Sequence, residues 1–303
     1  MIQLDKTALR GSIPPLITPF KNGAVDYDAY ADLVNFQFEQ GGHGILVNGT
    51  TSEPSSLTVE ERNRLVDVAV EAAAGRGHVV AATGSQSYAE TEALTLHAAK
   101  KPGVDALLIV TPYYSRPPQR GIVEYYKALA AQHDKLWMIY HIPGRAAVDV
   151  KRETVRQIAE ASPTFVGMKH ASTDLAFVSD LLQDHGEDFR IFVGLEDLSF
   201  PMMAVGACGL MNAVGNIQPG PLAAMCQAVW DGDLFRGREL HRQLFEINKA
   251  VFFDINPIPM KYMMKRLGIL PRNEHRLPLV PADAALERRL DDVLARTGFL
   301  KAA

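Results

Sequence analysis

Short apolar runs recur along the chain, and each is followed by polar residues and then by a segment with helical periodicity. The runs cover residues 13–17, 44–47, 78–82, 105–110, 136–140, 164–168, 189–193 and 208–211. They are continuously apolar rather than alternating, which is typical of strands in a parallel sheet that is covered on both faces. The pattern therefore predicts eight strand–helix units arranged as an α/β fold, the (β/α)8 TIM barrel.

A doubly wound sheet is the rival fold for such an alternation. It usually carries a glycine-rich phosphate-binding turn after its first strand. Here the first apolar run leads into Thr18-Pro19-Phe20-Lys21, which contains no glycine. The barrel is therefore the favoured architecture.

The pattern changes after about residue 231. Residues 234–252, 257–267 and 282–297 show helical periodicity, with no strand-like run between them. We therefore predict a barrel with the catalytic site over residues 1–231 and a C-terminal helical appendage over residues 232–303.

Composition and charge exclude several classes of protein. The 303 residues carry a net charge of -4, which gives no basic surface for nucleic acid. Histidines are scattered, and neither HExxH nor zinc-type Cys/His spacing occurs, so no metal site is expected. The cysteines, Cys208 and Cys226, lie in apolar surroundings and are expected to be free thiols in a reducing compartment.

The chain is expected to be cytoplasmic and not membrane-bound. Its N-terminus lacks a basic region followed by an apolar one, so no signal peptide is predicted. Residues 198–230 carry no charge, but Pro201, Pro219 and Pro221 help to divide them into pieces shorter than a membrane span. We expect this stretch to form buried barrel interior.

Polar residues that could perform chemistry collect after the predicted strands, where the loops of a barrel converge on one face. Lys169 ends the sixth apolar run and is the candidate nucleophile. A lysine amine can attack a keto acid carbonyl and form a Schiff base without any cofactor. Thr50, Thr51, Tyr113, Tyr114, Tyr140 and Arg145 follow other strands, and each alone would be a turn, rim or surface residue. Together they supply hydroxyls for proton transfer and a guanidinium for a carboxylate.

Five motifs resemble those of the class I pyruvate aldolases and lyases typified by dihydrodipicolinate synthase and N-acetylneuraminate lyase. Residues 49–53 resemble GTTGE, 111–114 match TPYY, and 140–145 resemble YNVPGR. Residues 167–169 resemble GIK, and 256–261 resemble NPIPVK. The likeness extends from about Gly11 to beyond Lys265, so the chain is identified as a member of this family.

The resemblance implies a role for each candidate residue. Lys169 would form the Schiff base with pyruvate, and Tyr140 would relay protons above the bound keto acid. Thr50 would link Tyr140 to Tyr114, which a neighbouring subunit would supply in a homotetramer built as a dimer of dimers. The remaining substrate-binding residues would be Thr51 for the pyruvate carboxylate, Arg145 for the carboxylate of the second substrate, and Gly194 and Met211 around the lysine pocket.

Several residues depart from the family motifs. Ser52 replaces a glycine, His141 replaces an asparagine, and Asn212 stands where the synthase usually has serine. Feedback-regulated synthases bind lysine with histidines of the helix after GTTGE. Those positions are occupied here by Val59 and Arg62, with Pro54 in place of a serine, so lysine inhibition is not expected.

Arg145 and the departures near GTTGE and YNVPGR both bear on the choice of substrate. Arg145 argues against a sialic acid lyase and for an acceptor aldehyde with its own carboxylate. The preferred prediction is an aldolase of a 2-oxo-4-hydroxy diacid, such as 2,4-dihydroxyhept-2-ene-1,7-dioate, that yields pyruvate and succinate semialdehyde. The alternatives are 4-hydroxy-tetrahydrodipicolinate synthase, which uses pyruvate and aspartate semialdehyde, a metal-dependent aldolase, and a non-catalytic barrel with a binding or regulatory role.

Overall fold

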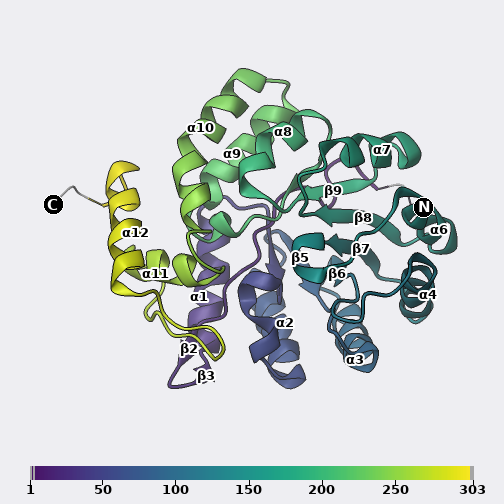
Figure 1. The fold of residues 1–303 in the computed structure, drawn as a ribbon, viewed down its shortest axis with the longest axis horizontal. Helices are drawn as coiled ribbons and strands as arrows, with labels where there is room; N and C mark the ends of the chain where they lie inside the picture. The colour runs from purple at the N-terminus through teal and green to yellow at the C-terminus, as the bar shows by residue number, and fades with distance from the viewer. Residues whose placement is uncertain (1, 3, 301–303) are drawn as a thin grey trace.

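The computed structural model describes residue 2 and residues 4–300 and shows eight parallel strands surrounded by helices (Figure 1). Neighbouring strands follow the order β1-β10-β9-β8-β7-β6-β5-β4. A parallel bridge between Pro15 and Leu46 joins the two ends of this order, so the sheet closes on itself. The predicted TIM barrel is confirmed. The strands are β1 (Gly11–Ser12), β4 (Gly44–Val47), β5 (His78–Ala82), β6 (Ala106–Val110), β7 (Leu136–His141), β8 (Phe165–His170), β9 (Arg190–Val193) and β10 (Gly209–Leu210).

Helices form the outer layer of the barrel. The helix α2 begins with a capping box, because Thr58 and Glu61 each accept a hydrogen bond from the other's backbone N–H. A four-residue helix, α5 (Pro143–Ala146), precedes α6 and carries Arg145. The outer helices are α1 (Tyr27–Glu39), α2 (Val59–Ala73), α3 (Tyr88–Ala99), α4 (Gln119–Ala130), α6 (Arg152–Ala161), α7 (Leu175–His185), α8 (Ser199–Ala204) and α9 (Pro219–Trp230).

Three further helices follow the barrel: α10 (Leu234–Ala250), α11 (Ile258–Arg266) and α12 (Ala284–Arg296). They lie at one side of the molecule in green to yellow (Figure 1), with α10 packed on α9 and α12 on α10 and α11. The predicted C-terminal helices are therefore present. The loop before α11 brings Asn256 back to the centre of the barrel face, where its side chain is buried.

Two cores hold these layers together. A small cluster fills the barrel interior, with Leu46, Leu108, Met138 and Phe192 among its members. A larger one lies between the sheet and the helices and extends into the C-terminal helices. Because side chains alternate along a strand, each of the strands β4 to β9 contributes residues to both cores, which explains their continuously apolar sequences.

Three local expectations were wrong. The first strand is Gly11–Ser12 rather than 13–17, because Pro14 and Pro15 have no N–H to donate to a ladder. An antiparallel hairpin of β2 (Phe20–Lys21) and β3 (Ala24–Val25), absent from the prediction, follows it. The uncharged residues 198–230 are not all barrel interior, since they form α8, β10 and α9. Among the described residues, no helix is both long and apolar enough to span a membrane.

Candidate active site

Lys169 lies within β8, which continues to His170, and its side chain is 3 % exposed. Its cross-strand neighbour on β7 is Tyr140, and the lysine Nζ lies 4.5 Å from the centroid of the tyrosine ring. A Cβ atom at Gly194 would approach Lys169 Cε to 3.0 Å and Ala171 Cβ to 2.8 Å. The glycine therefore leaves room for the lysine side chain.

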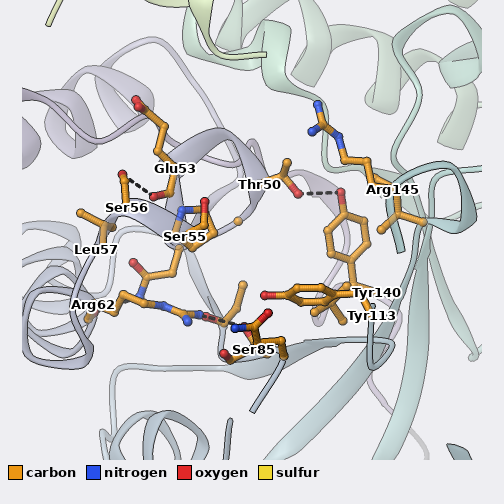
Figure 2. A pocket seen from close by; sticks show the side chains of 18 of the residues that line it. Thr50, Glu53, Ser55, Ser56, Leu57, Arg62, Ser85, Tyr113, Tyr140 and Arg145 are labelled. Atoms are coloured by element: carbon orange, nitrogen blue, oxygen red, sulfur yellow. Dashed lines mark hydrogen bonds between the residues drawn. The ribbon is translucent and has the colours of Figure 1, made fainter. Parts of the chain in front are cut away.

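The hydroxyl of Tyr140 is bonded to a second hydroxyl. Its OH lies 3.1 Å from Oγ1 of Thr50, which begins the 3₁₀ turn η1 (Thr50–Ser52) after β4 (Figure 2). The residue that ends this turn, Glu53, has a left-handed backbone conformation. Two hydroxyls in contact, beside a buried amine, can pass a proton between them.

The other residues of the 3₁₀ turn are held by the surrounding chain. Asn256 Nδ2 donates to Thr51 Oγ1 at 2.9 Å. Ser52, one of the departures from the family motif, donates to the Leu16 carbonyl and accepts a bond from Thr18 at its own carbonyl. The Ser52 hydroxyl is therefore committed to the N-terminal segment, and the substitution leaves the cavity beside Lys169 untouched.

A cavity of about 250 Å³ opens beside Lys169. It is large enough for a small keto acid next to the amine. Seven of the eight predicted site residues line it: Thr50, Thr51, Tyr140, Arg145, Lys169, Gly194 and Met211.

Tyr114, the eighth, does not line that cavity. It is 90 % exposed and has a left-handed backbone with φ 69°, while the preceding Tyr113 lines a neighbouring cavity. Within the described chain Tyr114 therefore does not contact Thr50. The resemblance implied such a contact only with Thr50 of a neighbouring subunit.

The neighbouring cavity measures about 590 Å³ and shares Thr50, Tyr140 and Arg145 with the smaller one. Figure 2 shows Arg62 at the opposite wall from Arg145. The Arg62 guanidinium donates to the carbonyls of Ala82 and Gly84, and burial lowers its pKa to about 10. The Arg62 side chain is therefore held by backbone carbonyls at the wall of this cavity.

Glu196 is a buried acid beside Lys169 that sequence reasoning did not select. It lies in the 3₁₀ turn η3 (Glu196–Leu198), lines the smaller cavity and is 2 % exposed. Its Oε1 accepts the Ala213 amide at 2.6 Å, while Oε2 has no partner among the described residues. Burial raises its pKa to about 7, although the nearby Lys169 acts in the opposite direction. The site thus contains a second ionisable group.

Among the described residues, no group of three or more His, Cys, Asp and Glu side chains is arranged to hold a metal ion. The candidate chemistry is instead carried by one amine, two hydroxyls and a guanidinium. This set suits covalent catalysis by the lysine, with proton transfer by the hydroxyls.

Comparison with known proteins finds similarity along almost the whole chain. The family model described as "Dihydrodipicolinate synthetase family" matches residues 8–297. A 4-hydroxy-tetrahydrodipicolinate synthase of Thermus thermophilus is 42 % identical over 292 residues, covering 96 % of this chain and 97 % of the relative. The crystal structure of dihydrodipicolinate synthase from Aquifex aeolicus superposes with a TM-score of 0.93 at 38 % identity, over 97 % of this chain and 100 % of the other. That from Thermotoga maritima gives 0.91 at 35 % identity, over 96 % and 99 %.

Proposed function

Because this chain belongs to the dihydrodipicolinate synthetase family of class I aldolases, we propose that it condenses pyruvate with aspartate semialdehyde. The activity is that of a 4-hydroxy-tetrahydrodipicolinate synthase, the name carried by its curated relatives. The observation that best supports it is the buried Lys169 amine beside the bonded hydroxyls of Tyr140 and Thr50.

The reaction begins at the lysine. The neutral amine of Lys169 attacks the ketone carbon of pyruvate, and the carbonyl oxygen takes up a proton to give a carbinolamine. A further proton transfer releases this oxygen as water and leaves an iminium ion. Delivery and uptake of these protons are assigned to Tyr140, and its hydroxyl contact of 3.1 Å with Thr50 Oγ1 supports this role.

Carbon–carbon bond formation follows from the iminium. Loss of a methyl proton gives an enamine, whose terminal carbon attacks the aldehyde carbon of the acceptor. The aldehyde oxygen takes up a proton, and water then releases the product from the lysine. No cofactor is needed, because the iminium accepts the electron pair itself.

Two carboxylates must be bound, one on each substrate. Thr51 is proposed for pyruvate, since its buried hydroxyl lines the cavity beside Lys169. Arg145 is proposed for the acceptor, since it lies at the boundary of the two cavities and its guanidinium can form two parallel bonds to a carboxylate.

The acceptor is where the preferred sequence prediction loses support. The relatives are named 4-hydroxy-tetrahydrodipicolinate synthase, which favours aspartate semialdehyde over the succinate semialdehyde of the 2-oxo-4-hydroxy diacid aldolase. Steady-state rates with pyruvate and each aldehyde test this choice. A kcat/KM at least about tenfold higher for aspartate semialdehyde is expected if a buried contact recognises its amino group, and the reverse ratio would restore the diacid aldolase.

Assembly and location are also proposals. We propose a cytoplasmic homotetramer in which Tyr114 completes the hydroxyl relay of a neighbouring subunit. Its 90 % exposure in the single chain supports this, because a large exposed aromatic side chain is typical of a residue that becomes buried when subunits associate. Replacing Tyr114 should then lower activity without changing the stability of the isolated fold.

A further inference from the structure

Two histidines stand behind the proposed catalytic pair. His141 ends β7 and His170 ends β8, and the two residues are cross-strand neighbours, as are Tyr140 and Lys169 one position earlier. Because side chains alternate along a strand, the histidines lie on the outer face of the sheet. Both are buried, with 2 % and 0 % of their surface exposed.

The two rings form a continuous chain of contacts. Their Nδ1 atoms are 3.1 Å apart. His141 Nε2 lies 2.9 Å from Asp149 Oδ1, and His170 Nε2 lies 3.0 Å from the Asp174 carbonyl oxygen. Phe177 of α7 packs against both rings.

These contacts need more protons than a neutral pair has. The Asp149 carboxylate and the Asp174 carbonyl can only accept, so each outer Nε2 must carry a hydrogen. The Nδ1 to Nδ1 contact needs a third hydrogen, but two neutral imidazoles have two between them. All three contacts are therefore satisfied only when His141 and His170 share one additional proton.

Two neutral histidines can form a different set of hydrogen bonds, in which one partner of His141 is lost. The Val150 amide points at His141 Nε2 from 3.4 Å and can donate to it once that nitrogen is bare. His141 Nδ1 then donates to His170, and His170 keeps its bond to the Asp174 carbonyl. The contact given up is the one with Asp149, whose side chain is half exposed and already bonded to Lys151 at 2.7 Å.

His141 and Asp149 stand at the two ends of the segment that carries Arg145. Between them lie residues 142–148, including α5. A bond between the ends of this segment fixes the base from which the arginine extends into the cavities. We propose that His141 is a positioning residue for Arg145: sharing one proton with His170, it holds Asp149 and closes segment 142–148. This role rests on the proposed function, in which Arg145 binds the carboxylate of the acceptor.

The charges around the pair set the pH at which it acts. Burial lowers the pKa of His141, Asp149 and Asp174 oppose this effect, and Lys151 adds to it. Burial and then the charge of His141 lower the pKa of His170 to about 4, so the two rings do not become doubly charged near neutral pH. Because burial lowers the pKa of both histidines below the ordinary value, segment 142–148 is closed in mildly acidic solution and loosens as the pH rises toward neutrality.

The test begins with the histidine rings themselves and needs no substrate. The full-length protein, isotope-labelled in histidine, is titrated by NMR as wild type, Asp149→Ala and Lys151→Ala. Both substitutions remove an exposed or half-exposed side chain from the same ion pair. Asp149→Ala is expected to lower the pKa of His141, and Lys151→Ala is expected to raise it. If the pKa of His141 shifted by the same amount in the same direction in both variants, the shared-proton pair would be overturned.

The positioning role is then measured in segment 142–148. At about pH 5 the amides of Ala146 and Ala147, which bond to the carbonyls of Ile142 and Pro143, should exchange about fivefold faster in Asp149→Ala than in Lys151→Ala. The KM for aspartate semialdehyde should rise by about fivefold from about pH 5 to about pH 7 in the wild type, because the pKa of His141 lies below its ordinary value, and this rise should disappear in Asp149→Ala.

A matched control is His97→Asn, which breaks a His–Asp contact of 3.0 Å between α3 and α2, away from the site. It should leave the pH dependence of KM intact. Loss of that dependence in His97→Asn, or unchanged exchange at Ala146 in Asp149→Ala, would overturn the positioning role. Absence of any aldol product with the histidine titrations as expected would instead remove the proposed function.

Discussion

Tyr140 and Lys169 are paired across β7 and β8, so that the lysine Nζ lies over the tyrosine ring at 4.5 Å. Both side chains point into the barrel from adjacent strands. This register fixes the amine and the hydroxyl relative to each other, because neither strand can slip without moving a buried core. The proposed chemistry depends on this pairing.

Removing the tyrosine hydroxyl tests the proton relay. In Tyr140→Phe the ring is kept but the contact with Thr50 is lost. Because general acid–base catalysis contributes about 10²–10⁴-fold, kcat is expected to fall by at least about 100-fold. Tyr113→Phe is the control, since Tyr113 lines the neighbouring cavity. Equal losses in the two variants would argue against a specific role for Tyr140.

Arg145→Ala tests the assignment of the acceptor carboxylate. Loss of the guanidinium leaves that carboxylate unpaired, so kcat/KM for the acceptor should fall. The expected loss of transition-state stabilisation is about 2–4 kcal/mol. The KM for pyruvate should change little. Arg120→Ala, an exposed arginine at the start of α4, controls for net charge. If pyruvate binding were lost while acceptor use survived, the two carboxylate sites would be exchanged.

Glu196 gives the fold a pH dependence of defined sign. Burial raises its pKa to about 7, so between its unfolded value and pH 7 the folded state binds more protons than the unfolded state. The free energy of unfolding therefore falls as the pH rises through this range. Glu196→Gln should remove that fall and stabilise the protein by about 3 kcal/mol at pH 8, with little effect at pH 5. Urea unfolding at both pH values measures the difference, and an equal effect at both would contradict the account.

A buried ion pair supports the 3₁₀ turn that carries Thr50 and Thr51. Lys261 Nζ lies 2.5 Å from Glu53 Oε1, and both side chains are almost fully buried. Lys261→Met would leave the Glu53 carboxylate without its cation and should cost about 3–5 kcal/mol of stability. The double variant with Glu53→Gln should recover most of this loss in urea unfolding. A double variant no more stable than Lys261→Met would show that the pair is not the cause.

Much of the site could be predicted because the carboxyl ends of parallel strands meet on one face. Lys169, Tyr140 and Arg145 were placed together by this rule, and they line one cavity. The first strand was misplaced because its apolar residues concealed the effect of two prolines. The hydrophobic pattern marked this region correctly as apolar, but it did not show which residues have a backbone N–H to donate.

Other features depend on packing that the sequence does not show. Glu196 follows a strand like any rim acid, and it becomes buried because the loop after β10 brings the Ala213 amide to its carboxylate. His141 and His170 are far apart in sequence and meet through the register of β7 and β8. Tyr113 and Tyr114 look equivalent in sequence, yet Tyr113 lines a cavity while Tyr114, which has a left-handed backbone, is exposed.

The central claim is that the buried amine of Lys169 forms a Schiff base with pyruvate. Borohydride reduces an iminium to a stable secondary amine, so incubation with pyruvate and borohydride followed by intact mass and peptide mapping tests it directly. We expect one reduced pyruvyl adduct per chain, on Lys169, and none in folded Lys169→Ala. An unmodified protein, or an adduct on another lysine such as Lys261, would contradict the account.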